Sequence, residues 1–124
     1  MIVAGLGFRA SCAADELVML VRRAEQAQGV VATALAAPDL KSSAPELIRA
    51  AEALGLMIVP ISPEALLAEQ PRCLTRSPAA LAAIGVAAVS EACALAAVGA
   101  GGVLLAPKLA SAAATCALAR GPLS

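Results

Sequence analysis

The chain has 124 residues, the size of one domain, and nine Lys and Arg balance nine Asp and Glu, so no net field would draw it to DNA or to an anionic membrane. Phe8 is the only aromatic residue, and the longest unbroken apolar stretch, 92–106, is too short to span a bilayer. With no basic segment ahead of its apolar start, we expect a cytoplasmic protein without nucleic-acid or membrane partners.

The first elements are a strand and an amphipathic helix. Residues 2–6 form a short apolar run typical of a buried strand. A helix is predicted to begin near Cys12 or Ala13, with Ser11 or a neighbour as its cap, and to end at Gly29. Its core-facing residues recur at helical spacing: Leu17, Leu20, Val21 and Ala24.

Two more strand and helix pairs follow. Residues 30–35 are predicted as a second buried strand, ended by Pro38. Ser43 and Glu46 have the spacing of a capping box, which predicts a helix up to Gly55. Residues 56–61 are the third apolar run, and Ser62 caps a short helix that is predicted to reach about Glu69.

The second half is rich in alanine. The polar connection 70–77 is predicted to be a mobile loop, and Ser77 with Pro78 predicts a helix start, whose pattern Gly85 breaks. Further elements are a helix from about Ser90 through Val98, a strand at 103–106 stopped by Pro107, and a last strand at 115–119. This alternation predicts an α/β fold: a single three-layer domain over residues 1–124, with a mostly parallel sheet and helices on both faces.

The cysteine and histidine content restricts the chemistry. The four cysteines form no CxxC pair, and there is no histidine to complete a zinc site or to act as a general base. We therefore interpret the cysteines as reduced thiols buried like small apolar residues. No metal site and no cofactor are expected.

Residues that directly follow strands are the best candidates for ligand binding, because ligands of such folds bind at the carboxyl ends of parallel strands. Basic residues follow three of the predicted strands: Arg9, Lys41 and Lys108. If these strands are parallel, the three cations converge on one edge, which predicts an anion site there. The candidate ligand-binding residues are Gly5, Gly7, Arg9, Ser11, Asp39, Lys41, Lys108 and Thr115.

Simpler interpretations remain open for each of these residues. A single loop cation is often only solvated, and Asp39 suits a turn better than acid catalysis. Glu91 is a candidate general base, although the sequence favours an exposed helix residue. Gly5, Gly7 and Ala10 fit a dinucleotide fingerprint, but the late helix start and the cation at Arg9 make nucleotide binding the weaker interpretation.

Five segments together resemble a known family. They are GLGFRAS from Gly5, PDLKSSAPEL from Pro38, TRSPAAL from Thr75, GVAAVSEACAL from Gly85 and LLAPKLASAAATCALAR from Leu104. In order and spacing they are similar to the CobE family of cobalamin-biosynthesis proteins and to the C-terminal domain of CbiG. The better-matching residues are Gly5, Gly7, Arg9, Asp39, Lys41, Glu91, Lys108 and Thr115.

The resemblance implies a role in building the corrin ring of vitamin B12. It leaves two hypotheses open. A CobE-like protein would bind a precorrin or related tetrapyrrole by its peripheral carboxylates and pass it to other cobalamin-biosynthesis enzymes. A CbiG-like hydrolase would open the ring-A lactone of a precorrin-5A with release of acetaldehyde, using Asp39 or Glu91 as base and Lys108 to polarise the carbonyl. Because the chain resembles only the C-terminal domain of CbiG, the CobE-like protein is the nearer match.

Overall fold

The computed structural model describes residues 1–74 and 89–122. In chain order these residues form β1 (Ile2–Phe8), α1 (Ala14–Gln28), β2 (Ala34–Pro38), α2 (Pro45–Leu54), β3 (Met57–Ile61), α3 (Pro63–Ala68), the 3₁₀ helix η1 (Gln70–Arg72), α5 (Ser90–Val98), β4 (Val103–Leu104), β5 (Leu109–Ala110) and β6 (Ala114–Arg120). The helix predicted to start at Ser77 and the break at Gly85 lie outside the described residues.

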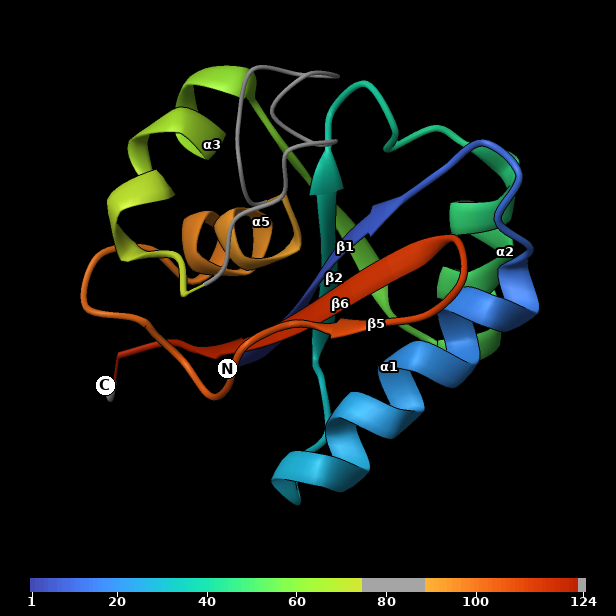
Figure 1. The fold of residues 1–124 in the computed structure, drawn as a ribbon, viewed down its shortest axis with the longest axis horizontal. Coiled ribbons are helices and arrows are strands. Elements are labelled where there is room, and N and C mark those ends of the chain that lie inside the picture. The colour runs from blue at the N-terminus through green and yellow to red at the C-terminus, as the bar shows by residue number, and fades with distance from the viewer. Residues whose placement is uncertain (75–88, 123–124) are drawn as a thin grey trace.

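The strands form one six-stranded sheet in the order β3-β2-β1-β6-β4, with β5 paired to β6 (Figure 1). β1, β2 and β3 are parallel, whereas β6 is antiparallel to β1, β4 and β5. A mostly parallel sheet was predicted, and the parallel part consists of β1, β2 and β3. The difference arises at the turn after β5, where the Ser111 N–H donates to the Ala114 carbonyl at 2.8 Å and the chain reverses as a hairpin into β6.

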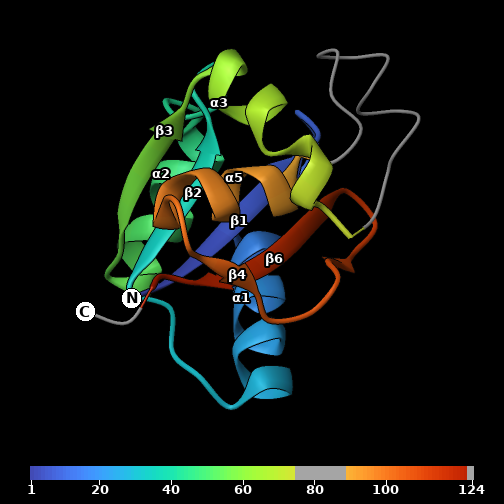
Figure 2. The ribbon, with the colours of Figure 1, turned by 90° about the vertical axis from the view of Figure 1, so that its left-hand side faces the viewer.

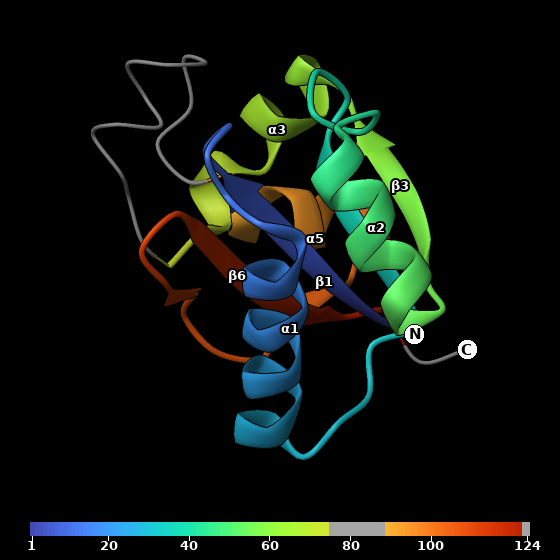
Figure 3. The same cartoon turned by 90° about the vertical axis from the view of Figure 1, so that its right-hand side faces the viewer.

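Helices cover both faces of the sheet, which confirms the predicted three-layer α/β fold. α1 and α2 cover one face (Figure 3) and α3 and α5 the other (Figure 2). Successive residues of β1 enter alternate cores, because a strand points its side chains to opposite faces. Ala4 and Leu6 pack with α1 and α2, whereas Val3 packs with α5.

The apolar stripes of the helices are confirmed, but two of the three predicted caps are wrong. All four residues of the predicted stripe of α1 are buried, and α1 ends at Gly29, whose φ of 66° is left-handed. Ser62 caps α3 as predicted, accepting the Ala65 N–H at 3.2 Å. α1 begins after Ala13, close to the predicted start, but no side chain caps it and Ser11 is exposed. α2 begins after Ala44, without the predicted capping box at Ser43.

Strand bounds shift where the sequence pattern is apolar on both sides of a boundary. β1 continues to Phe8, two residues beyond the predicted end. β2 starts only at Ala34, and Val31, which was predicted to lie in this buried strand, is 72% exposed. β4 has two residues instead of four, and β5 was not predicted. The start of the predicted mobile loop is η1, while residues 75–77 lie outside the described ranges.

Candidate functional site

The carboxyl ends of the three parallel strands lie side by side at one edge of the sheet. The pairs Gly5 with Ala36 and Pro38 with Ile61 set the register of β1, β2 and β3. β6 begins at the same edge, where Phe8 pairs with Ala114. Arg9, Asp39 and Ser62 are the first residues after β1, β2 and β3, so the predicted convergence holds for these three strands.

Arg9 and Lys41 are the cations at this edge. Arg9 is exposed, and its backbone N–H donates to the Ala113 carbonyl at 2.9 Å, which ties it to the start of β6. The Nζ of Lys41 lies 5.2 Å from the centroid of the Phe8 ring, a cation–π contact between the ends of β2 and β1. Neither cation forms an ion pair with any residue that the structure describes.

Asp39 and Ser11 lie at the same edge as exposed loop residues. The Asp39 backbone N–H donates to the Ile61 carbonyl at 2.9 Å, and its carbonyl accepts the Ser42 hydroxyl at 2.9 Å. Within the described ranges, no hydrogen bond or ion pair involves the Asp39 carboxylate. These contacts are those of a turn residue.

The two predicted glycines and Thr115 lie on the face covered by α5. Gly5 is buried beneath this helix so closely that a Cβ at residue 5 would overlap the Ser90 carbonyl oxygen. Gly7 pairs with Thr115, whose hydroxyl lies 3.5 Å from the Gly7 carbonyl oxygen, the outer limit of a hydrogen bond. The glycines therefore let α5 approach β1, a role in packing.

Glu91 is completely buried, so the expectation of an exposed helix residue is wrong. Its Oε1 accepts the backbone N–H of Leu74 at 3.0 Å, and its Oε2 accepts that of Lys108 at 3.1 Å. The carboxylate thus joins α5 to two chain segments that are distant in sequence. The neighbouring Ser90 hydroxyl is also buried and has no hydrogen-bond partner in the described part of the chain.

Lys108 does not lie with Arg9 and Lys41. It lies between β4 and β5, one residue before the pair Leu109 and Cys116. β6 begins beside the carboxyl end of β1 and runs antiparallel to it. Lys108 therefore lies beside the middle of β6, away from the carboxyl end of β1. The edge at the carboxyl ends of β1 and β2 therefore holds two of the three predicted cations. Lys108 lies elsewhere, on the side of the sheet formed by β4 and β5.

Glu16 holds the β5–β6 hairpin, a contact that sequence patterns did not predict. Its Oε2 accepts the Ala113 N–H at 2.7 Å and the Ser111 hydroxyl. These hydrogen bonds, that of the Ser111 hydroxyl first, lower the pKa of the Glu16 carboxyl. An acid in the first turn of a helix generally interacts with the helix dipole, whereas the partners of Glu16 are almost a hundred positions away in the chain.

The hydrogen bonds of Glu16 should stabilise the fold less in acid than at neutral pH. Because the pKa of folded Glu16 is lowered, its contribution to stability is complete above the ordinary value of 4.5 and is lost as the pH falls through the lowered value. We expect the difference in unfolding free energy between the wild type and Glu16→Gln to shrink as the pH falls from neutral to about 3. Urea titrations followed by circular dichroism measure it. A constant difference across that range would contradict a contribution to stability from ionised Glu16.

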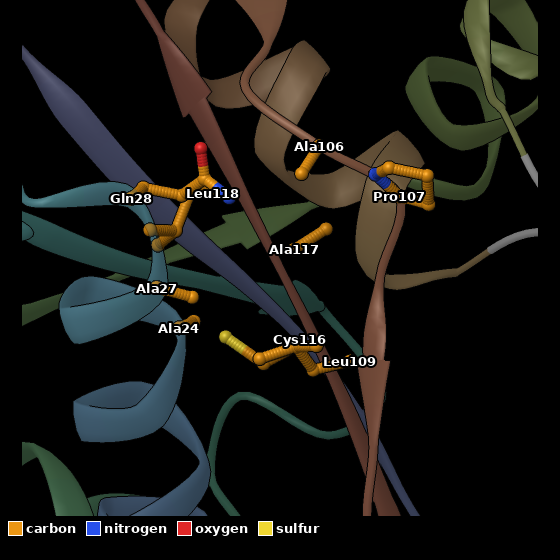
Figure 4. Close-up of a pocket in the computed structure, with 9 residues that line it drawn as sticks. All are labelled: Ala24, Ala27, Gln28, Ala106, Pro107, Leu109, Cys116, Ala117 and Leu118. Atoms are coloured by element: carbon orange, nitrogen blue, oxygen red, sulfur yellow. The ribbon is translucent and has the colours of Figure 1, made fainter.

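Three of the four cysteines are buried as interpreted, and all are free. Burial raises the pKa of the Cys116 thiol to about 12 and also raises that of Cys93. Cys116 faces α1 across a small hollow of about 30 Å³ between α1 and the β5–β6 edge (Figure 4). No Lys or Arg lines this hollow, so its chemistry does not match an anion.

Two properties of the described residues concern membranes and metals. No helix within them is long and apolar enough to cross a bilayer. Among residues 1–74 and 89–122, no cluster of three His, Cys, Asp or Glu has the arrangement of metal ligands.

Comparison with known proteins gives one family and several related structures. The family described as Cobalamin synthesis G C-terminus matches residues 2–119. The crystal structure of CobE, a protein from the cobalamin biosynthetic pathway, is 35% identical, with a TM-score of 0.91 over 97% of this chain and 89% of CobE. The cobalamin biosynthesis protein chiG from Agrobacterium tumefaciens is 40% identical, with a TM-score of 0.79 over 98% of both chains.

A third structure is similar in fold alone. It is a putative cobalamin biosynthesis protein G homolog from Sulfolobus solfataricus, 23% identical, with a TM-score of 0.70 over 95% of this chain and 36% of the other. No curated protein matches the chain.

Proposed function

Because the chain belongs to the cobalamin synthesis G C-terminal family, we propose that it is a CobE-like protein that binds a tetrapyrrole intermediate of cobalamin biosynthesis by its peripheral carboxylates. The proposal places the ligand at the carboxyl ends of β1 and β2. A carrier of this kind, working in the cytoplasm, would pass the intermediate to other enzymes of the pathway.

The observation that carries the proposal is the pair of cations at this edge. Arg9 follows β1, Lys41 follows the adjacent parallel strand β2, and neither is in an ion pair with a described residue. Cations that no carboxylate within residues 1–74 and 89–122 neutralises are available to a ligand. The guanidinium of Arg9 can bind a carboxylate through two parallel hydrogen bonds, while Lys41 acts as a point charge.

Other residues at the edge suit the same ligand. The Ser11 hydroxyl is exposed beside Arg9 and can donate to a second carboxylate. Lys108 lies farther along β6 and, on this proposal, reaches only a ligand broad enough to extend past the hairpin. A macrocycle with acetate and propionate groups around its rim has both the width and the charge.

Titration with uroporphyrin, a stable tetrapyrrole acid, followed by its visible spectrum tests the proposal. We expect the double variant Arg9→Gln, Lys41→Gln to bind about ten- to a hundredfold more weakly, since each exposed charge-assisted contact is worth about 1 kcal/mol. Lys108→Gln should weaken binding less. Raising the salt concentration should weaken binding to the wild type more than to the double variant.

The matched control is the double variant Arg23→Gln, Arg49→Gln. Both residues are exposed on α1 and α2, and the change in net charge is the same. Binding within about twofold of the wild type is expected, because general attraction between distant charges is largely screened. Equal weakening in both double variants would refute a site at the strand ends.

The alternative function, hydrolysis of a ring-A lactone, has less geometric support. Each Glu91 carboxylate oxygen already accepts a backbone N–H, and Asp39 is an exposed turn residue whose carboxylate makes no hydrogen bond or ion pair with a described residue. Binding therefore remains the better-supported function. Release of acetaldehyde from a lactone substrate would favour hydrolysis instead.

A further inference from the structure

The only aromatic side chain of the protein lies at the proposed binding edge. Phe8 is the last residue of β1, directly before Arg9, and its side chain is only half-buried. It packs against the end of the core between the sheet and helices α1 and α2. Lys41 covers the ring, with its Nζ 5.2 Å from the centroid. The edge thus combines an apolar aromatic surface with a cation lying directly on it.

We propose that Phe8 is the surface on which the macrocycle of the ligand stacks, and that Lys41 leaves the ring to bind one of the ligand's carboxylates. This inference rests on the tetrapyrrole binding proposed above. A contact between an exposed ammonium and an aromatic ring is weaker than a hydrogen bond between an ammonium and a carboxylate. A carboxylate can therefore draw Lys41 off the ring, and the uncovered ring then contacts the flat conjugated face of the ligand.

The shape and charge of the edge agree with a ligand that is apolar in the centre and acidic at the rim. Arg9 follows Phe8 directly in sequence, and Lys41, in the loop after the adjacent strand β2, lies over the Phe8 ring. Leu40, in that same loop, is 76% exposed and adds apolar surface at this edge. The hollow at Cys116 offers no comparable pattern, since it lacks cations.

Because the chain contains a single Phe, incorporation of 4-fluorophenylalanine gives one fluorine resonance, and it reports on Phe8 alone. On titration with uroporphyrin we expect this resonance to shift under the ring current of the porphyrin. The shift should saturate at the same ligand concentration as the change in the visible spectrum. Phe8→Leu, which keeps an apolar side chain but removes the ring, should bind about five- to tenfold more weakly.

Two control variants separate stacking from general effects. Phe8→Tyr keeps the aromatic face and should bind within about twofold of the wild type, as should Met57→Ala, which removes an exposed apolar side chain on the distant strand β3. Lys41→Met keeps an apolar cover over the ring without the charge, so we expect weaker binding but a retained fluorine shift. Circular dichroism checks that each variant is folded.

The outcomes distinguish this inference from the proposed function. If uroporphyrin binds while the fluorine resonance stays in place, Phe8 is not the stacking surface, although the proposed function stands. If uroporphyrin does not bind the wild type at all, both the proposed function and this inference are wrong. If Phe8→Leu does not fold, the fluorine shift in the otherwise unchanged chain still decides.

Discussion

Replacing Gly5 by alanine should destabilise the protein by about 3 kcal/mol or more, the upper range for adding atoms to a packed core. A Cβ at residue 5 would overlap the carbonyl oxygen of Ser90 and lie 2.6 Å from the backbone nitrogen of Ala94. Both contacts are with the backbone of α5, which cannot move aside as a side chain could. The whole helix would have to shift away from β1. Urea unfolding followed by circular dichroism measures the loss.

Gly7→Ala is the matched control, two residues along the same strand and on the same face. A Cβ there would lie 3.0 Å from the Thr115 hydroxyl oxygen and 3.4 Å from the Val89 side chain. Both neighbours are side-chain atoms that can adjust, so we expect a loss of about 1 kcal/mol or less. Equal losses in the two variants would contradict the close approach of α5 to β1.

The second large effect is expected from Glu91→Gln. Gln presents one oxygen and one NH₂ group where the carboxylate has two acceptors, so one of the two backbone N–H groups, of Leu74 or of Lys108, loses its partner and faces another donor. A buried donor left unsatisfied costs roughly 1–3 kcal/mol, and more when its partner was charged. We therefore expect a loss of about 3 kcal/mol in the free energy of unfolding.

Amide hydrogen exchange gives a second measurement on the same variant. Exchange at the amides of Leu74 and Lys108 should become faster. Once the change in global stability is taken into account, the amides in the middle of α1 should exchange as they do in the wild type. Glu52→Gln, an exposed residue of α2, is the control and should change stability by no more than about 0.5 kcal/mol. A Glu91→Gln variant as stable as this control would show that the carboxylate does not hold the two segments together.

The sequence predicted what depends on local periodicity. Leu17 and Leu20 face the core because helical spacing brings them to one side, and Ser62 caps α3 because its hydroxyl is in reach of the N–H three residues on. The helix starts at Ala14 and Pro45 lie within about two residues of the predicted starts, but no side-chain hydrogen bond caps either helix. Val31 shows the limit of local patterns, because an apolar residue before a strand has no local signal of exposure.

The candidate site was predicted where it depends on parallel strands and missed where it depends on the hairpin. Arg9 and Lys41 converge because β1 and β2 are parallel neighbours. Lys108 does not, because the two-residue strand β5 carries no periodic signal and its hairpin reverses the chain. Glu91 was expected at the surface because a lone acid in an alanine-rich helix usually is exposed; its partners are backbone groups, which any sequence could supply.

The open edge of the sheet at β3 has a consequence for association with other chains. Ile61 directs its carbonyl inward to the Asp39 N–H, so Pro60, one residue earlier, faces outward, away from β2. Proline has no N–H, so the outward row of donors is interrupted at the position where an incoming strand would pair. Although Met57 leaves apolar surface exposed on this strand, the backbone itself resists extension of the sheet and the aggregation that such extension begins.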